Sequence, residues 1–150
     1  MNINTILYFI AYLIIYSFAG WVIESVYKSI YEKKFVNSGF LIGPYCPIYG
    51  FGAVIMLLAL SSLKEKPILL FIASFFMLSC WEYLVALILE KVFKTKYWDY
   101  SDLKFNIHGR VCLKNSIYWG VLGLVFIYFL HPFVENFIKQ NPISLLIYIE

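Results

Sequence analysis

The chain has 150 residues, of which 62% are apolar, 21% aromatic and only 14% charged, with a formal net charge of +3. A soluble domain is about half apolar and a quarter charged, so this composition and a mean hydropathy of +0.77 exclude that class. Each membrane crossing takes about 20 residues. We therefore predict an all-α polytopic membrane helix bundle, a single integral domain over residues 1–150 that is embedded in the lipid bilayer. We expect no nucleic-acid partner.

Four apolar runs are long enough to be considered as transmembrane helices. Short stretches that contain lysine and proline separate them. The predicted four transmembrane helices cover residues 4–30, 47–63, 67–93 and 113–130.

The two ends of the chain complete the predicted topology. The first residues, Met1 to Asn4, lack the cationic start and cleavage site of a signal peptide, so the first run is interpreted as a permanent helix. The tail at residues 131–150 begins with His131-Pro132 and mixes apolar with polar residues. It is predicted to lie at the membrane interface.

Lysine and arginine are distributed unevenly over the predicted loops. Nine of them fall on one side of the membrane and three on the other. By the positive-inside rule the richer side is cytoplasmic. The sequence thus predicts a multi-pass protein of the cell membrane with both termini outside and the two longer loops inside. The richer side holds Lys28, Lys33, Lys34, Lys91, Lys94, Lys96, Lys104, Arg110 and Lys114, and the other holds Lys64, Lys66 and Lys139.

Two glutamates, Glu24 and Glu82, lie inside the first and third apolar runs. An ionisable side chain in hydrocarbon is costly and marks a functional site by default. In the predicted topology both lie in the cytoplasmic half of the bilayer. Glu24 can pair with Lys28 one turn later, whereas Glu82 needs a partner from another segment, for which Arg110 is the candidate. The alternative is that both carboxyl groups only tie helices together.

The segment that follows the first helix is unusual for a loop. Residues 36–50 are too apolar for an exposed connection and too rich in glycine and proline for a helix. Irregular backbone at membrane depth requires burial in protein or a wet cavity. We predict a re-entrant or packed loop in which Asn37 bonds to its own backbone. The alternative is a packed turn that supports the second helix.

The loop between the third and fourth helices carries most of the polar chemistry. Asp99, Asn106 and His108 offer oxygen and nitrogen ligands, and Arg110 could hold a phosphate or carboxylate with its two-pronged guanidinium group. A bound metal is the alternative to loop caps and solvated charges. We favour loop caps and solvated charges, and we predict no metal and no cofactor.

Other motifs limit the chemistry. The chain has three cysteines, Cys46, Cys80 and Cys112, whose predicted positions favour free thiols. It contains no P-loop motif, so it cannot hydrolyse ATP by that route. The two halves also echo one another weakly, as expected either of a parallel two-helix repeat with a site between the copies or of coincidence. The echo pairs Trp21, Glu24 and Gly43–Cys46 with Trp81, Glu82 and Gly109–Cys112.

A longer pattern of motifs runs through the chain, over roughly residues 8 to 125. It comprises Gly20-Trp21 with Glu24-Ser25, the run from Asn37 to Gly52, Trp81-Glu82-Tyr83, Trp98 to Ser101, and Asn106 to Cys112. This pattern resembles the ABC-transporter type IV (CmpB-like) family of small bacterial membrane proteins. One departure is Ser38, where the family usually has arginine. The resemblance implies a permease that requires a separate ATPase subunit and assembly into a homo-oligomer.

The sequence therefore predicts a permease-like transporter component that moves a small or lipid-linked solute through a polar cytoplasmic-facing site. One alternative is a membrane-embedded enzyme that acts on a lipid head group, with Asp99 or Glu82 as base. Another is a non-catalytic membrane scaffold. Enzymatic activity is the less favoured reading. The candidate site residues are Glu24, Glu82, Asn37, Asp99, Asn106, His108 and Arg110.

Overall fold

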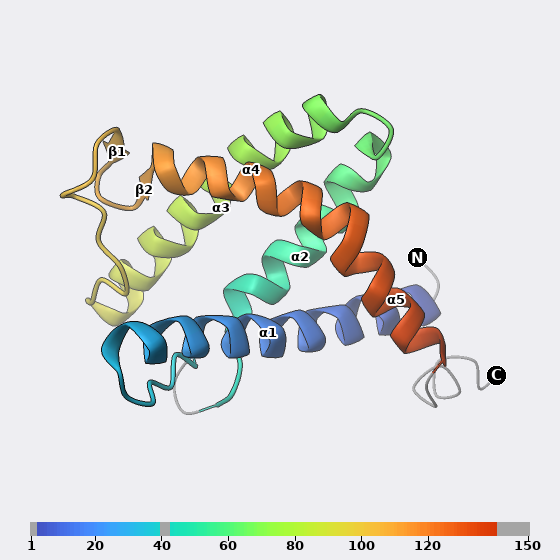
Figure 1. The fold of residues 1–150 in the computed structure, drawn as a ribbon, viewed down its shortest axis with the longest axis horizontal. Coiled ribbons are helices and arrows are strands. Elements are labelled where there is room, and N and C mark those ends of the chain that lie inside the picture. The colour runs from blue at the N-terminus through green and yellow to red at the C-terminus, as the bar shows by residue number, and fades with distance from the viewer. Residues whose placement is uncertain (1–2, 40–42, 141–150) are drawn as a thin grey trace. The chain divides into compact units, whose positions relative to one another are not determined.

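A computed structural model of the chain describes residues 3–39 and 43–140 (Figure 1). Over these residues the fold is all-α apart from one two-residue antiparallel hairpin, as the sequence predicts. The elements are α1 (Ile3–Glu32), α2 (Pro47–Leu60), the 3-10 turn η1 (Ser61–Leu63), α3 (Pro67–Phe93), β1 (Asn106–Ile107), β2 (Val111–Cys112), α4 (Leu113–Val125), the π-helical turn η2 (Phe126–Leu130) and α5 (His131–Gln140).

Three stretches are long and apolar enough to cross a membrane, namely Thr5–Glu32, Pro67–Phe93 and Leu113–Gln140. The chain is thus a multi-pass membrane protein. The predicted span at residues 47–63 forms a shorter apolar helix. With 14 residues in α2 and three in η1, it is about 25 Å long, somewhat less than the roughly 30 Å hydrocarbon core. A fourth crossing is therefore a prediction and not a finding.

The sequence predicts that the fourth apolar helix ends at Leu130, and this boundary is wrong. Helical structure continues through His131-Pro132 to Gln140. Proline lacks the N–H of a regular helical bond and its ring clashes with the preceding turn. Here the preceding turn, η2, is a π-helix, and such a wider turn accommodates the irregularity. The interfacial position predicted for residues 131–150 stays a prediction, and residues 141–150 lie outside the described part.

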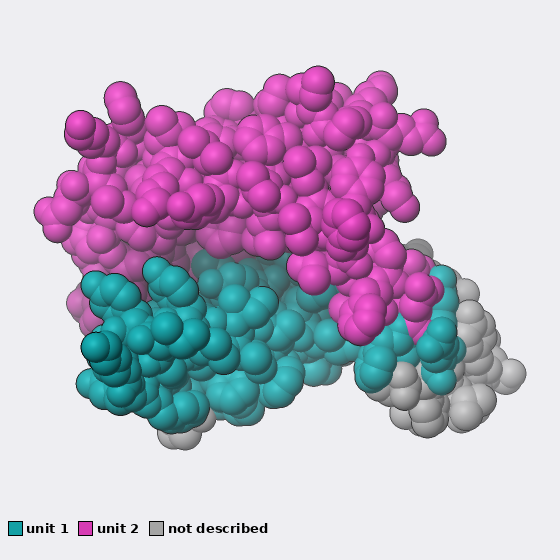
Figure 2. All heavy atoms as spheres, viewed as in Figure 1, with its two compact units in different colours: residues 1–55, 137–150 teal, residues 56–136 magenta. Residues whose placement is uncertain are grey.

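The chain divides into two compact units, residues 1–55 with 137–150 and residues 56–136 (Figure 2). We describe each unit by itself. The prediction of a single integral domain is not tested by this division.

In the first unit, the segment after α1 folds back along α1. The N–H groups of Val36 and Ser38 donate to the hydroxyls of Ser29 and Ser25, at 2.8 and 3.1 Å. Farther on, Cys46 N donates to the Ser17 carbonyl at 2.9 Å, and Ser17 lies near the middle of the candidate span. Consequently α2 begins beside the middle of α1 rather than at its end. Phe40 to Ile42 of the sequence motif lie outside the described residues.

In the second unit, α3 packs extensively against α4. The hydroxyl of Ser79 on α3 donates to Ser116 on α4 at 2.6 Å. Close approach is possible because Gly123 on α4 faces Ser74 on α3, where a Cβ atom would collide with the serine side chain. In the first unit Gly50 of α2 faces Ser17 of α1 in the same way. Both helix pairs thus use a glycine against a buried serine.

Candidate functional site

Glu82 lies on the face of α3 that packs against α4, and only 4% of its surface is exposed. Both of its carboxyl oxygens accept hydrogen bonds. The indole Nε1 of Trp119 donates to Oε2 at 2.9 Å, and the Tyr100 hydroxyl donates to Oε1 at 3.0 Å. A buried carboxyl group requires such partners, because an unsatisfied one would carry a large desolvation penalty. Glu82 therefore connects α3, the following loop and α4.

The loop at residues 94–112 holds Tyr100 in place. The backbone N–H of Tyr100 donates to the Gly109 carbonyl at 2.7 Å. The nearby Trp98 Nε1 donates to the Arg110 carbonyl at 3.0 Å. Burial, together with the adjacent Glu82 carboxylate, raises the pKa of Tyr100 above its usual value. The Tyr100 hydroxyl therefore stays protonated and remains a donor at neutral pH.

Arg110 forms a second cluster with Tyr83 and Glu90 of α3. Its Nη2 lies 2.7 Å from Glu90 Oε2, and its Nε lies 3.3 Å from Glu90 Oε1. Its Nη1 donates to the Tyr83 hydroxyl at 3.0 Å, and that hydroxyl lies 2.9 Å from His108 Nδ1. The bond with Glu90 raises the pKa of Arg110 above its already high value. Arginine fits a carboxylate in this two-pronged manner better than lysine does.

Asp99 and Asn106 organise the loop itself. Asp99 Oδ2 accepts from Lys96 Nζ at 2.8 Å, and its Oδ1 accepts from Ser101 N at 3.0 Å. The bonds with Lys96 and Ser101 lower the pKa of Asp99 to about 2. Asn106 Nδ2 donates to the Leu103 carbonyl at 2.8 Å, and its Oδ1 accepts from Gly109 N at 3.0 Å. These side chains act as loop caps.

In the first unit, Glu24 pairs with Lys28, and the Nζ to Oε1 distance is 2.7 Å. The Cys46 thiol donates to the Ser38 carbonyl at 3.1 Å and lies 4.0 Å from Glu24 Oε2. Burial, and secondarily the Glu24 charge, raises the pKa of Cys46 to about 11. A thiol with that pKa is mostly protonated at neutral pH and a poor nucleophile.

Asn37 anchors the folded-back loop to α1. Its Oδ1 accepts from Trp21 Nε1 at 2.7 Å and from Gly39 N at 3.0 Å. The predicted bond from the Asn37 side chain to its own loop is therefore confirmed. All three cysteines are free, also as predicted.

The predicted site residues therefore fall into two groups. Glu24 and Asn37 belong to the first unit, and the second unit brings Glu82, Asp99, Asn106, His108 and Arg110 into one loop and helix pair.

The predicted partner of Glu82 was wrong. Arg110 bonds Glu90, and Glu82 is held by Tyr100 and Trp119 instead. The reason is position along α3. Glu90 is eight residues beyond Glu82, about 12 Å nearer the end of the helix, where the loop carries Arg110. Sequence reasoning missed the roles of Tyr83, Glu90, Tyr100 and Trp119, although Tyr83 is part of the Trp81-Glu82-Tyr83 motif.

The described residues offer no preformed metal centre. Among them no three His, Cys, Asp or Glu side chains converge. The oxygens of Asp99 are engaged by Lys96 and Ser101, and the guanidinium of Arg110 by Glu90 and Tyr83. What the site can do is connect the protonation or bonding of one buried carboxyl group to the position of a loop.

The comparisons with known proteins give a family match. The sequence profile of the family described as "Putative ABC-transporter type IV" matches residues 11–150. No curated protein and no solved structure matches the chain. The match covers nearly the whole chain and includes both helix pairs and both motif loops. The chain belongs to the ABC-transporter type IV family.

Proposed function

We propose that this chain is the membrane-spanning component of a transporter and that Glu82 is its proton-exchanging or cation-exchanging group. The family and the apolar helices are consistent with a membrane transporter component. The observation that carries the finer proposal is the Glu82 carboxyl group, buried in a candidate span and bonded to both a loop and a second helix.

Protonation of Glu82 would change its bonding. A carboxylate accepts at both oxygens, whereas a carboxylic acid carries one O–H donor and keeps less acceptor capacity. Tyr100 and Trp119 both donate to the carboxyl group in the present arrangement. A proton or cation at Oε1, the oxygen to which Tyr100 donates, would therefore weaken that bond and loosen the loop that carries Asp99 and Arg110. This change would open the site toward the cytoplasmic side.

The loop after α1 supports transport by a second route. Its backbone returns to the middle of a candidate span, where Cys46 N bonds Ser17 O. We propose that residues 33–39 and 43–46 belong to a re-entrant segment, because irregular backbone at that depth is found only where it is buried in protein or lines a water-filled cavity. Glu24, beside Lys28 and Cys46, would be the polar group of this segment.

The partners follow from the family and the sequence. The sequence has no P-loop motif, and an ABC transporter is driven by ATP. We therefore propose a separate ATPase subunit, docked at the cytoplasmic loops of a homo-oligomer. The cytoplasmic side of the loops rests on the positive-inside rule.

The scaffold is the one alternative that a specific observation favours. Tyr100 and Trp119 each donate to one oxygen of Glu82, which ties α3 to the loop and to α4. If Glu82 only tied helices together, glutamine would serve nearly as well, because its amide keeps an acceptor for Trp119 and can donate to the Tyr100 oxygen. A lipid enzyme with Asp99 as base is less well supported, because the lowered pKa of Asp99, about 2, makes it a weak base.

A flux measurement distinguishes transport from scaffolding. Purified protein is reconstituted into liposomes that contain a pH-sensitive dye, and a pH gradient is imposed with the membrane potential clamped. Wild-type vesicles should dissipate the gradient faster than empty vesicles. Glu82→Gln should lower that rate by about a hundredfold, the low end for losing a positioned proton-transfer group.

The matched control removes the same charge at an exposed position. Glu65→Gln alters the exposed connection between η1 and α3 and should leave the flux unchanged, while thermal unfolding verifies that both variants fold. Equal flux in the wild type and Glu82→Gln would reject the role of Glu82. A wild-type rate no higher than that of empty vesicles would reject proton exchange by this chain.

A further inference from the structure

Helix α4 presents a continuous apolar stripe away from α3. Leu113, Ile117, Val121 and Val125 follow one another at intervals of four residues and are all exposed. Residues four apart lie on one face of a helix. Because α4 belongs to a candidate membrane span, this stripe is the face that contacts lipid.

The loop at residues 94–112 extends that stripe beyond the end of the helix. The N–H of Leu113, the first residue of α4, donates to the Phe105 carbonyl at 3.2 Å. Phe105 therefore lies next to the first residue of the candidate span. Its side chain is 78% exposed, and that of Ile107 is 56% exposed. These are large apolar side chains with no protein surface over them.

The exposed side chains stand on a turn that backbone pairing and side-chain hydrogen bonds hold together. Asn106 pairs with Cys112 across the β1–β2 hairpin. The Asn106 amide also donates to the Leu103 carbonyl at 2.8 Å and to the Ser101 carbonyl at 3.2 Å. The polar groups of the turn are thus bonded inward, and Phe105 is presented outward.

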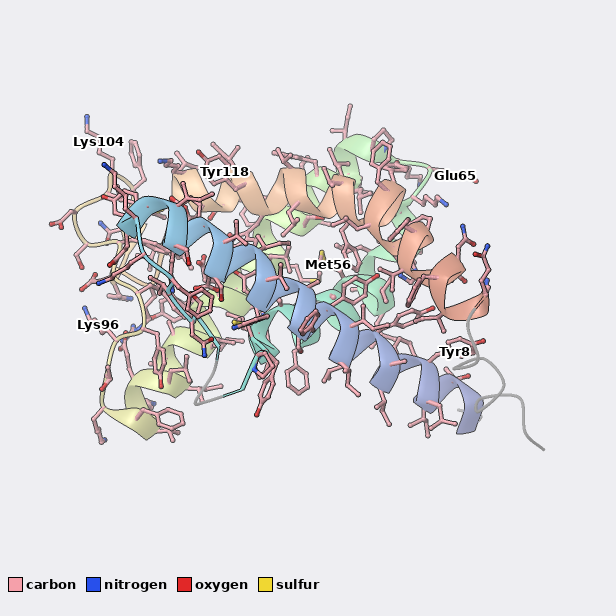
Figure 3. The ribbon with its side chains drawn as sticks, turned by 60° about the horizontal axis from the view of Figure 1, so that its bottom comes forward. Tyr8, Met56, Glu65, Lys96, Lys104 and Tyr118 are labelled. Carbon is pink, nitrogen blue, oxygen red and sulfur yellow. The ribbon has the colours of Figure 1, made fainter. Side chains whose placement is uncertain are left out.

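Two lysines border this apolar surface. Lys104 precedes Phe105 and extends away from the loop (Figure 3). Lys114 follows Leu113, and its Nζ lies 5.9 Å from the centre of the Tyr118 ring. Within the described ranges 3–39 and 43–140, neither lysine forms an ion pair with a carboxylate. Both charges are available to an external anion.

We propose that Phe105, Ile107, Lys104 and Lys114 form a membrane-surface anchor that binds the phosphate-bearing head groups of anionic lipids. The apolar side chains enter the interfacial layer beside the stripe of α4, and the two ammonium groups contact lipid phosphates. Aromatic residues gather at this depth of a bilayer, and each nearby lysine strengthens the attraction to an anionic surface. This inference does not depend on the transport role of Glu82.

A soluble partner protein is the competing occupant of the same surface. The position of Phe105 favours lipid, because its backbone is bonded to the first residue of the lipid-facing stripe. A surface reserved for a soluble partner would instead stand in water when that partner is absent. The two occupants therefore predict different surroundings for residue 105 in pure lipid vesicles.

The first experiment measures the surroundings of residue 105 in vesicles without any partner. Phe105→Cys is introduced into a Cys80→Ala background, in which Cys46 and Cys112 are buried, and a nitroxide label is attached. Its accessibility to oxygen and to a water-soluble nickel complex reports its depth. Val121→Cys on the stripe and Lys33→Cys in the turn after α1 provide the lipid and water references.

The label at residue 105 should give an interfacial depth between those of the two references. It should lie deeper in vesicles that contain phosphatidylglycerol than in vesicles of phosphatidylcholine alone. A value equal to that of Lys33→Cys in both mixtures would overturn the proposal and leave the surface to a soluble partner.

The second experiment measures the head-group preference. The protein is first reconstituted into vesicles that contain equal amounts of phosphatidylglycerol and phosphatidylcholine. It is then extracted with detergent that removes part of the lipid, and the lipid molecules that stay bound are counted. Lys104→Gln with Lys114→Gln should lower the retained phosphatidylglycerol up to about five-fold per lysine, the effect of about 1 kcal/mol for each charge. Lys33→Gln with Lys34→Gln, which removes two charges elsewhere, should change it little. Equal retention of both lipids by the wild type would contradict the proposal.

Discussion

The Tyr100 hydroxyl donates to Glu82 at 3.0 Å although Glu82 lies eleven residues before the end of α3 at Phe93. That separation corresponds to about 16 Å along the helix. The loop after α3 must therefore turn back along the helix to make the bond. The loop after α1 turns back too, from Ser29 to Ser17. In both helix pairs the connection brings polar groups back beside the preceding helix.

Removal of the Tyr100 hydroxyl should expose the cost of an underbonded carboxyl group. Tyr100→Phe leaves Glu82 with its side-chain bonds to Trp119 and Asn115, and we expect a loss of about 1–3 kcal/mol of unfolding free energy. The matched control is Tyr118→Phe, which deletes the same hydroxyl from an exposed position and should change stability little. Thermal unfolding in one detergent compares the two variants, and equal effects would count against the bond.

The pair between Arg110 and Glu90 should behave as one unit. Arg110→Gln and Glu90→Gln each break a two-pronged contact, so the double variant should lose much less stability than the sum of the single variants. Arg110→Lys should rescue only in part, because an ammonium group cannot form both bonds in the same plane. Additive effects in this double-mutant cycle would show that the two side chains are not coupled.

Asp99 should make the order of the loop depend on acid. Its pKa is lowered from 3.8 to about 2, so its stabilising contribution is complete above about pH 5 and is lost as the pH falls toward 2. The protection of the Ser101 amide, which donates to Asp99 at 3.0 Å, should fall over that window once the measured hydrogen-exchange rate is divided by the intrinsic rate at each pH. Asp99→Asn should remove this pH dependence, and an identical response in wild type and variant would refute it.

Cys46 should resist alkylation in the folded protein. Its pKa is raised from 9.0 to about 11, which lowers the thiolate fraction about a hundredfold, and only the thiolate reacts. In a background with Cys80→Ala and Cys112→Ala, a maleimide should label Cys46 slowly until the protein is unfolded in detergent. Rapid labelling of the native state would mean that the loop does not bury the thiol.

The apolar helices were predictable because hydrophobic length is a strong signal. Predicted residues 67–93 coincide with α3, and predicted residues 47–63 with α2 and η1. Length alone could not reveal that α2 starts beside the middle of α1, because that depends on the bond from Cys46 to Ser17. Nor could it show the helix passing Pro132, because the π-helical turn before it has no residue signature.

The site was predictable in part. Glu82 was identified because a carboxyl group inside an apolar run is costly in itself, whatever surrounds it. Its partners were not, because Trp119 is 37 residues away and reaches Glu82 only through the packing of α4 on α3. Arg110 was the predicted partner because a buried carboxylate is expected to pair with a positive charge. The loop instead brings Arg110 to Glu90, nearer the end of the helix.

The flux of protons through vesicles that carry Glu82→Gln tests the central claim most directly. Glutamine keeps the size and most of the hydrogen bonds of Glu82 but cannot exchange a proton. We predict flux near that of empty vesicles for this folded variant, and wild-type flux for Glu65→Gln. A folded Glu82→Gln protein with the wild-type rate would contradict the account and leave Glu82 as a structural tie between α3, the loop and α4.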